Sequence, residues 1–272
     1  MADLLTLTDT DILYRCWESA QPRAVLLLVH GLGAHAGRWQ YLADYFQPRQ
    51  TTIYAPDLKG FGATPGPRGH IDSFRQYDRD LALLLRRIKS RHPSLPVFLY
   101  GESMGGVIAV NFAAGQPQGL AGLILSSPVF VSTLSFPLAD YLKVFSSLVF
   151  NPRRTISLPF NTAMCTSDPA VRQTMDADPL ELRVASAKLL VNILLEQTRV
   201  LRSARQLQLP TLFLTAGQDQ FGDNRAVRKV FERMPLRDKT FLAYPDMLHV
   251  LHAERERERV FKDVETWFAQ RM

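Results

Sequence analysis

The sequence predicts an α/β protein with a mostly parallel central sheet and helices on both of its faces. Short apolar segments of strand length alternate with segments whose apolar residues recur at helical spacing. The segments 97–101, 123–127 and 211–215 are rich in apolar residues, as expected for strands that helices cover on both sides. Turns rich in glycine or proline follow several of these segments.

Strands and helices follow one another in a regular order. The expected strands are residues 12–18, 24–30, 51–57, 97–101, 123–127, 211–215 and 240–244. The expected helices are residues 38–46, 73–91 and 104–114, and a C-terminal helix whose core face carries Val260, Phe261, Val264, Trp267 and Phe268. Ser73 is the expected N-cap of the helix over 73–91, and Pro93 ends it.

The alternation of strands and helices breaks after residue 127. The chain between this point and the strand at 211–215 is mostly helical in pattern and is interrupted by prolines. We therefore expect a core domain made of residues 1–127 and 206–272, and a mainly helical cap formed by the insertion 128–205.

The composition is that of a globular, soluble protein. Of the 272 residues, 46% are hydrophobic and 21% are charged, and the formal net charge is +6. The basic residues are scattered and many alternate with acidic ones, so we expect no nucleic-acid partner. The densest apolar run, residues 24–29, is far shorter than the roughly 20 residues that cross a bilayer.

The two cysteines, Cys16 and Cys165, have neither the spacing of metal ligands nor that of a disulfide framework, which suits a reducing compartment. The N-terminal residues 1–11 lack the basic start and apolar run of a signal peptide. The expectation is a cytoplasmic protein without a metal site. The sequence does not indicate an oligomeric state.

A Gly-x-Ser-x-Gly motif lies between the strand at 97–101 and the helix that follows it. On a sharp turn of this kind, Ser103 would be held in a strained conformation with its hydroxyl exposed above the carboxyl ends of the strands. Ser103 is therefore the candidate nucleophile. The alternative is that Ser103 only caps the helix beginning at Met104.

A second glycine motif, His30-Gly31-Leu32-Gly33, follows the strand at 24–30. Attack on an ester carbonyl creates an oxyanion, which needs donors fixed in place before the reaction. The backbone N–H groups of Leu32 and Met104 are the candidate donors. His30 is interpreted as structural. The alternative is that the segment is an ordinary glycine-rich turn.

A serine hydroxyl needs a positioned base at neutral pH. Of the six histidines, only His249 and His252 lie between the last strand and the closing helix. His249 is favoured, because it lies in the loop directly after the strand. His252 would lie near the start of the helix, exposed or in a structural hydrogen bond.

The carboxylate that orients the base is expected after the penultimate strand, where Asp219 stands. Asp223 is the second choice and is more typical of a helix N-terminus, while Asp246 is interpreted as a turn residue. The resulting chain order, Ser103, Asp219 and His249, is that of α/β-hydrolases.

These motifs together resemble the monoacylglycerol lipase and lysophospholipase group of α/β-hydrolases. The matching segments are His30-Gly31-Leu32-Gly33, Asp57-Leu58-Lys59-Gly60-Phe61-Gly62, Gly101 to Gly106, Gly217-Gln218-Asp219, and His249 with Glu254. They span almost the whole chain in the family's order. The resemblance implies the α/β-hydrolase fold, a serine carboxylic ester hydrolase acting on lipid esters through an acyl-enzyme, and no cofactor.

The resemblance also implies that the insertion is a cap that covers the active site and forms an acyl-chain pocket. Phe136, Tyr141 and Phe145 belong to a strongly apolar stretch of the cap and are the candidate substrate-binding residues. Such a surface would also suit transient contact with a membrane or micelle. The alternative is that these residues pack the cap onto the core.

Related enzymes with other activities carry different residues in the motif around Ser103. Haloalkane dehalogenases and epoxide hydrolases use aspartate where this chain has Ser103. Proline iminopeptidases usually show Gly-Gly-Ser-Trp-Gly, which Glu102 and Met104 do not match, although Glu181 and Glu196 could face an amine. Thioesters and aryl or other small acyl esters stay open as substrates. A non-catalytic binding module on a hydrolase scaffold is the alternative from another class.

Overall fold

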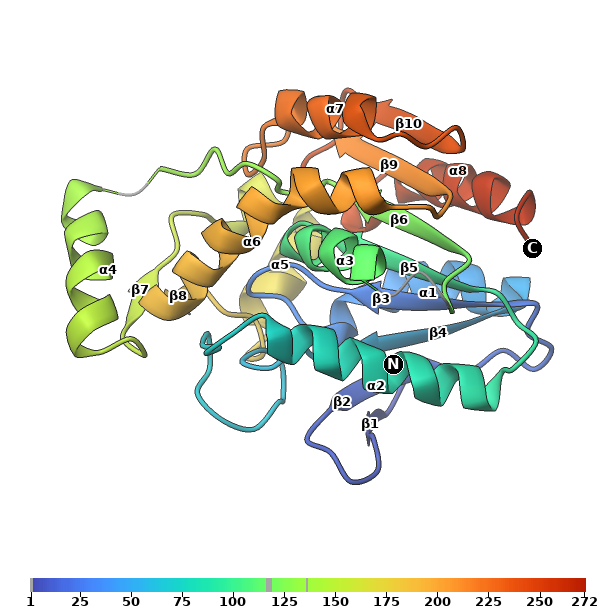
Figure 1. The fold of residues 1–272 in the computed structure, drawn as a ribbon, viewed down its shortest axis with the longest axis horizontal. Coiled ribbons are helices and arrows are strands. Elements are labelled where there is room, and N and C mark those ends of the chain that lie inside the picture. The colour runs from blue at the N-terminus through green and yellow to red at the C-terminus, as the bar shows by residue number, and fades with distance from the viewer. Residues whose placement is uncertain (1, 116–118, 136) are drawn as a thin grey trace.

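The computed structural model describes residues 2–115, 119–135 and 137–272. Its centre is an eight-stranded sheet in the order β1-β2-β4-β3-β5-β6-β9-β10 (Figure 1). The strands are β1 (Leu4–Thr6), β2 (Leu13–Trp17), β3 (Ala24–Val29), β4 (Thr51–Pro56), β5 (Val97–Glu102), β6 (Gly122–Ser126), β9 (Thr211–Ala216) and β10 (Lys239–Tyr244). The pairs from β4 to β10 are parallel, and β1 and β2 add an antiparallel edge.

The four central strands β3, β5, β6 and β9 are buried along their whole length, which explains their apolar composition. Their register aligns their carboxyl ends. Val29 pairs with Gly101, and Glu102 pairs with Ser126. The loops that follow these strands therefore meet at one edge of the sheet, where α/β proteins bind ligands.

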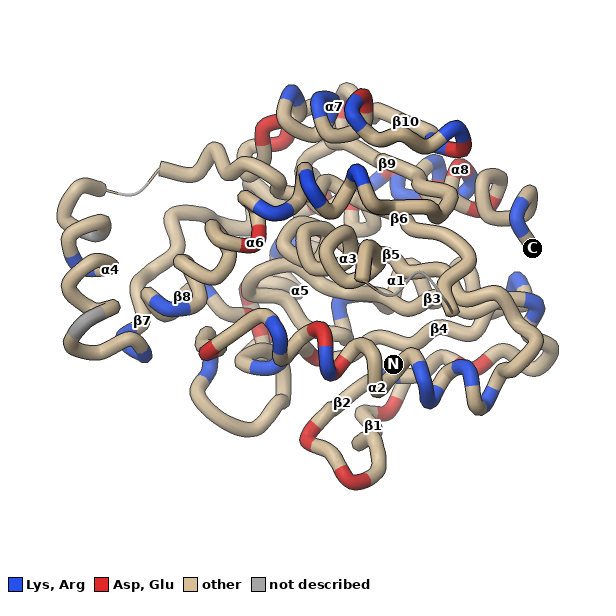
Figure 2. The backbone as a smooth tube through the Cα atoms, viewed as in Figure 1, with Lys and Arg blue, Asp and Glu red and all other residues tan. Residues whose placement is uncertain are grey.

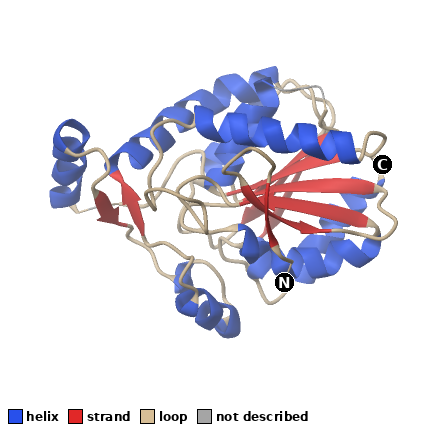
Figure 3. Cartoon of the chain, turned by 90° about the horizontal axis from the view of Figure 1, so that it is seen from below, coloured by secondary structure: helices blue, strands red, loops and turns tan. Residues whose placement is uncertain are grey.

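Helices cover both faces of the sheet (Figure 3). The α-helices are α1 (Gln40–Phe46), α2 (Arg75–Arg91), α3 (Met104–Gly115), α4 (Leu138–Phe150), α5 (Pro169–Ala177), α6 (Ala187–Gln206), α7 (Asn224–Arg233) and α8 (Arg257–Ala269). Apolar residues of α2, α3, α6 and α7 form one core cluster with the sheet, and those of α1 and α8 form another. The predicted fold class is confirmed.

Two helix starts differ from the sequence expectation. The segment 38–46 is divided, with a 3-10 helix η1 (Ala36–Trp39) leading into α1. Helix α2 begins at Arg75, and the residue before it, Phe74, makes no side-chain cap. Ser73 lies one residue before the N-cap position, and its Oγ accepts the N–H of Arg75 at 3.3 Å. The prediction of Ser73 as the N-cap was therefore wrong by one position.

The insertion is less purely helical than expected. Besides α4, α5 and the 3-10 helix η3 (Thr162–Met164), it contains the antiparallel pair β7 (Thr155–Ser157) and β8 (Val184–Ser186), which lies apart from the main sheet (Figure 3). Helix α6 starts in the insertion and then packs along α3, where Val200 and Ala204 join the core. The division into core and cap at residue 205 stays a prediction, because α6 runs through it.

Lysine and arginine are spread over many elements and alternate with acidic residues (Figure 2). Within the described residues, no helix combines the length and the apolar character needed to cross a membrane.

Candidate active site

Ser103 stands on the turn between β5 and α3 with φ of +56°, a left-handed conformation that is costly for a residue with a side chain. Two glycines allow this turn. A Cβ at Gly101 would lie 2.4 Å from the carbonyl oxygen of Gly105, and a Cβ at Gly105 would lie 2.2 Å from that of Val29. The helix therefore packs directly on the neighbouring strand, and the serine is pushed outward.

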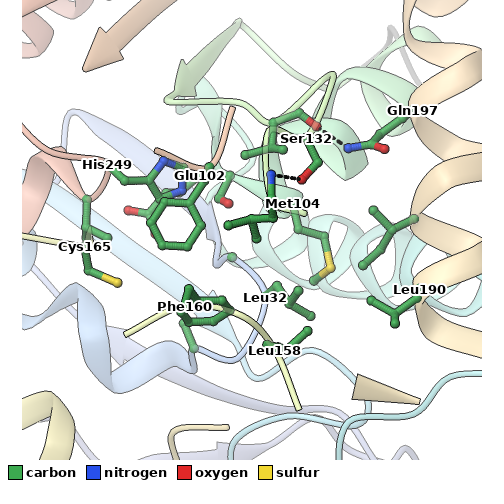
Figure 4. Close-up of a pocket in the computed structure, with 18 of the residues that line it drawn as sticks. Leu32, Glu102, Met104, Ser132, Leu158, Phe160, Cys165, Leu190, Gln197 and His249 are labelled. Carbon is green, nitrogen blue, oxygen red and sulfur yellow. Dashed lines mark hydrogen bonds between the residues drawn. The ribbon is translucent and has the colours of Figure 1, made fainter. Parts of the chain in front are cut away.

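The loop after β3 lies against the nucleophile. A Cβ at Gly31 would lie 3.0 Å from Ser103 Cβ, so only glycine fits comfortably there. Leu32 and Met104 both line the cavity that Ser103 faces (Figure 4). Among the described residues, the backbone N–H groups of Leu32 and Met104 have no hydrogen-bond acceptor and are available to a ligand.

His30, at the start of this loop, is buried and holds the loop in place. Its Nδ1 lies 2.8 Å from the carbonyl oxygen of Gly31, and its Nε2 accepts the N–H of Leu58 at 3.0 Å. Burial lowers the pKa of His30 to about 4, so the ring is neutral at physiological pH. The interpretation of His30 as structural agrees with these contacts.

His249 and Asp219 form a buried pair on the loops after β10 and β9. His249 Nδ1 lies 2.8 Å from Asp219 Oδ2. The other carboxylate oxygen of Asp219 accepts the N–H groups of Phe221 at 2.7 Å and Gly222 at 3.2 Å, which fixes its orientation. The Phe221 ring stacks on the imidazole with 4.3 Å between centroids.

Burial alone would lower the pKa of His249, but the charge of Asp219 and its hydrogen bond outweigh burial, and the pKa is raised. The carboxylate accepts a hydrogen bond from Nδ1–H. The neutral ring therefore carries its proton on Nδ1 and presents Nε2 as the acceptor. His249 lines the same cavity as Ser103.

His252, the second candidate base, belongs to a different pair. It lies in the 3-10 helix η4 (Leu251–Ala253), is 1% exposed, and packs against the indole of Trp39 with 4.4 Å between centroids and the rings tilted by 34°. Its Nδ1 lies 2.6 Å from Glu102 Oε2, close enough for an ion pair although the two groups are not aligned as a hydrogen bond. Of the two alternatives expected for His252, exposure is wrong, and its buried place beside Glu102 is structural. It also does not line the cavity.

The alternative carboxylates have structural places. Asp223 is the N-cap of α7, and its side chain accepts the N–H of Arg225 at 2.9 Å. Asp246 is exposed in the turn after β10. The carboxylate of Asp57 accepts the N–H groups of Ala36 at 2.7 Å and Ala63 at 2.9 Å, so it ties two loops together.

The cavity above Ser103 has a volume of about 550 Å³ and two chemically different parts. Most of its wall is apolar. Leu158, Phe160 and Leu190 belong to this part (Figure 4), as do Ile193 and Leu194. Charged side chains also line it, namely Arg38, Glu102, Glu181 and Arg183.

Each charged side chain of the cavity lies beside a partner of opposite charge or an imidazole, either within the cavity wall or just outside it. Arg38 Nη1 lies 2.5 Å from Glu181 Oε1, and Arg183 lies 3.3 Å from Asp176. The charges of His252 and Arg38 hold the pKa of Glu102 below its ordinary value although burial opposes this. Sequence reasoning missed Arg38 as a cavity residue. Its position shortly after the glycine motif at 30–33 was the available signal.

The three candidate substrate-binding residues of the cap have different outcomes. Phe136 lies outside the described residues. Tyr141 of α4 lines the cavity. Phe145, one turn further along α4, is 73% exposed and is not part of the cavity wall, so a substrate-binding role for it stays a prediction that the cavity does not support. Helix α4 carries it beyond the cavity into solvent.

Within residues 2–115, 119–135 and 137–272, the His, Cys, Asp and Glu side chains form no cluster of three that could hold a metal ion. Among these residues, the arrangement above Ser103 offers a hydroxyl, a buried imidazole–carboxylate pair and free backbone N–H groups. These are the components of acyl transfer by a serine nucleophile.

Known proteins are similar to this chain in sequence and in fold over most or nearly all of its length. The family model described as serine aminopeptidase, S33 matches residues 20–256. Monoglyceride lipase of Rattus norvegicus is 31% identical, with 99% of this chain and 91% of that protein covered. Phospholipase YtpA of Bacillus subtilis is 29% identical, with 90% and 95% covered.

The fold matches solved structures. A monoacylglycerol lipase of Paleococcus ferrophilus superposes with a TM-score of 0.86 at 22% identity, covering 99% of this chain and 100% of that one. A monoglyceride lipase of Saccharomyces cerevisiae, in complex with a substrate analog, gives 0.86 at 21% identity, covering 100% and 96%. The chain therefore belongs to the serine aminopeptidase S33 family of α/β-hydrolases, as its resemblance to the monoacylglycerol lipase and lysophospholipase group predicted.

Proposed function

We propose that the protein is a serine hydrolase of lipid esters, acting on monoacylglycerols or lysophospholipids through an acyl-enzyme intermediate. The observation that carries the proposal is that Ser103 and the Asp219–His249 pair open onto one largely apolar cavity. The cavity volume of about 550 Å³ lies in the range of small-molecule sites. The names of the relatives, monoglyceride lipase and phospholipase, support the same substrate class.

In the first step, Ser103 Oγ attacks the ester carbonyl while His249 Nε2 takes the hydroxyl proton. Asp219 orients the ring and stabilises the imidazolium that forms. The N–H groups of Leu32 and Met104 donate to the oxyanion. The C–O bond to the alcohol then breaks, and the alcohol leaves with the proton from Nε2, which gives the acyl-enzyme.

In the second step, water attacks the acyl carbonyl and gives its proton to His249 Nε2. The bond to Ser103 Oγ breaks, the serine regains its proton, and the fatty acid leaves. Every proton that moves passes through one imidazole nitrogen. The residues of this chain complete the cycle without a cofactor.

The two parts of the cavity suit the two parts of such a substrate. An acyl chain would lie along the apolar wall with Leu158, Leu190 and Ile193, since burying it there removes apolar surface from water. The polar alcohol part would lie toward Arg38 and Glu102. The charged side chains there are already paired, so none is left over to bind a charged group of the substrate. An uncharged, hydroxylated head group would not require one.

An aminopeptidase activity fits the cavity less well, although the family carries that name. A free amine needs an unpaired carboxylate. Glu181 and Glu102 are paired with Arg38 and His252. Glu196 is not part of the cavity wall and accepts hydrogen bonds from Asn111 and Arg199.

Helix α4 supports transient contact with a membrane or micelle as part of the proposal. Its exposed apolar side chains are Leu138, Tyr141, Leu142, Phe145 and Phe150. A helix that exposes such residues beside a lipid-binding cavity can lie against a lipid surface and admit a substrate from it. The double substitution Leu142→Ser with Phe145→Ser should reduce the fraction of protein that sediments with phosphatidylcholine vesicles. Hydrolysis of a short, water-soluble ester should stay unchanged.

A hydrolysis screen with purified protein tests the function. It should include monoacylglycerols, lysophospholipids, p-nitrophenyl esters and aminoacyl amides, with Ser103→Ala as the control. We expect the highest kcat/KM for a lipid ester and no turnover by the control. Turnover of aminoacyl amides alone would overturn the proposal.

A further inference from the structure

The loop that carries His249 is joined to the insertion by a buried carboxylate. Glu254 is 2% exposed. Its Oε1 accepts the N–H of Leu248 at 3.1 Å and the N–H of Ser167 at 2.9 Å, and its Oε2 accepts the hydroxyl of Ser167. Leu248 directly precedes His249, whereas Ser167 belongs to the insertion. One side chain thus connects two segments that are distant in sequence.

Further bonds join the same two segments. The N–H of Val250, directly after His249, donates to the carbonyl oxygen of Cys165 at 2.8 Å. The hydroxyl of Thr166 donates to the carbonyl oxygen of Ala253 at 2.9 Å. The two peptide N–H groups that flank His249 are therefore both bonded, one to Glu254 and the other to the insertion.

The opposite side of this loop is attached to the Asp219 loop, where the N–H of Gln218 donates to the carbonyl oxygen of Met247 at 3.0 Å. The position of the imidazole is thus set from two sides. Asp219 fixes one ring nitrogen, but the distance from Nε2 to Ser103 also depends on where the backbone of His249 lies. A displacement of about 1 Å in a reacting group can reduce a rate about a hundredfold.

We propose that Glu254 is a positioning residue for the imidazole of His249, with Ser167 as its partner in the insertion. The segment 165–168 is then a fixed part of the active site and does not move away from it as a lid would. This inference rests on the proposed function, in which His249 is the base. Glu254 acts as a hydrogen-bond acceptor through its geometry.

The variants separate positioning from charge and from stability. Glu254→Met keeps the volume and removes the acceptors. Glu254→Gln retains a carbonyl oxygen for the two N–H groups, while its amide can donate to the Ser167 hydroxyl. The matched control is Ser186→Ala. Ser186 is fully buried and lies 2.8 Å from His70 Nδ1 through its hydroxyl. It does not line the cavity, and it forms hydrogen bonds with His70, Leu189 and Gly69, none of which belongs to the loop 248–254.

The measurements are the rate at which a fluorophosphonate labels Ser103, kcat and KM for a soluble ester, the pH profile of kcat/KM, and Tm. For Glu254→Met we expect labelling and kcat to fall about a hundredfold with KM within about threefold of the original. The acid limb should move to lower pH, because a loosened imidazole gains less from Asp219. Glu254→Gln should recover both rates to within about fivefold, and Ser186→Ala should lower Tm alone.

Unchanged labelling in Glu254→Met, with a loss of Tm like that of Ser186→Ala, would overturn the proposal. Equal impairment of Glu254→Gln and Glu254→Met would overturn it too, since charge would then be the cause. Should Glu254→Met fail to fold, Glu254→Asp decides, because it keeps the charge but shortens the reach. A loss of about tenfold in labelling at unchanged Tm supports the proposal, and unchanged labelling refutes it.

The labelling assay needs no lipid. If the unsubstituted protein is labelled at Ser103 but cleaves no lipid ester, the proposed function is refuted. The variants would then still decide whether Glu254 positions His249. A protein that does not label at Ser103 would refute both.

Discussion

His249 and Asp219 lie 2.8 Å apart through Nδ1 and Oδ2, with their side chains 5% and 2% exposed. A second imidazole–carboxylate pair, His252 with Glu102, is equally buried nearby. Only the first of the two imidazoles lines the cavity with Ser103. The two pairs therefore have different expected roles, catalysis for the first and support of the nucleophile's turn for the second.

Asp219→Asn should lower kcat by about a thousandfold to ten-thousandfold. The amide can force the imidazole into the wrong tautomer and no longer stabilises the imidazolium. Steady-state kinetics on a soluble ester check this. Asp223→Asn is the matched control, since asparagine is also a good N-cap for α7 and its activity should stay unchanged. Equal losses in both variants would contradict the assignment of Asp219.

Ser103→Gly and Ser103→Ala should both abolish turnover, and Ser103→Gly should also stabilise the fold. The φ of +56° costs a residue with a side chain on the order of 1 kcal/mol or more, which glycine avoids. Chemical denaturation should therefore show a higher unfolding free energy for glycine than for alanine at this position. Residual esterase activity in either variant would mean that another group is the nucleophile.

The pH profile of kcat/KM should lose activity on the acid side with a midpoint above 6.5, the ordinary pKa of histidine. The reaction needs neutral His249, whose pKa is raised because Asp219 outweighs burial, so the ring takes up its proton before the pH falls to 6.5. Glu102→Gln should move this midpoint to lower pH, because it removes a negative charge that raises the pKa of His249. His92→Asn, outside the cavity, should leave it in place.

Gly105→Ala should destabilise the protein by about 3 kcal/mol or more. The new Cβ would lie 2.2 Å from the carbonyl oxygen of Val29, so helix α3 or strand β3 must shift. Gly115→Ala, at the other end of the same helix, meets no atom of the described residues within 4 Å and should be neutral or stabilising by up to about 1 kcal/mol. Urea denaturation measures both. Similar effects of the two substitutions would contradict the close packing of α3 on β3.

Arg38→Met should cost about 3–5 kcal/mol, because it leaves Glu181 buried without its partner at 2.5 Å. The double variant Arg38→Met with Glu181→Met should recover most of this loss, since no unpaired charge remains. The free energies of unfolding of the two single variants and the double variant give the coupling energy between Arg38 and Glu181. Additive losses would show that the two side chains do not depend on each other.

The sequence by itself determined the order of strands and helices, the turn at Ser103 and the loops on which Asp219 and His249 stand. These features follow from local rules: apolar periodicity sets strand and helix, and glycine allows backbone approach where a Cβ would collide. Parallel strands place their following loops at one edge, so three distant motifs could be expected to lie near one another. The cytoplasmic location expected from the cysteines stays a prediction.

Only the tertiary structure decided which histidine pairs with which carboxylate, that Arg38 meets Glu181, and that Glu254 joins the His249 loop to Ser167. It also placed Tyr141 at the cavity and Phe145 in solvent. These contacts join residues far apart in the chain, and their distances depend on how helices and loops pack in three dimensions. No periodicity or spacing along the sequence encodes such a distance, because packing selects among many loop paths that the same motifs allow.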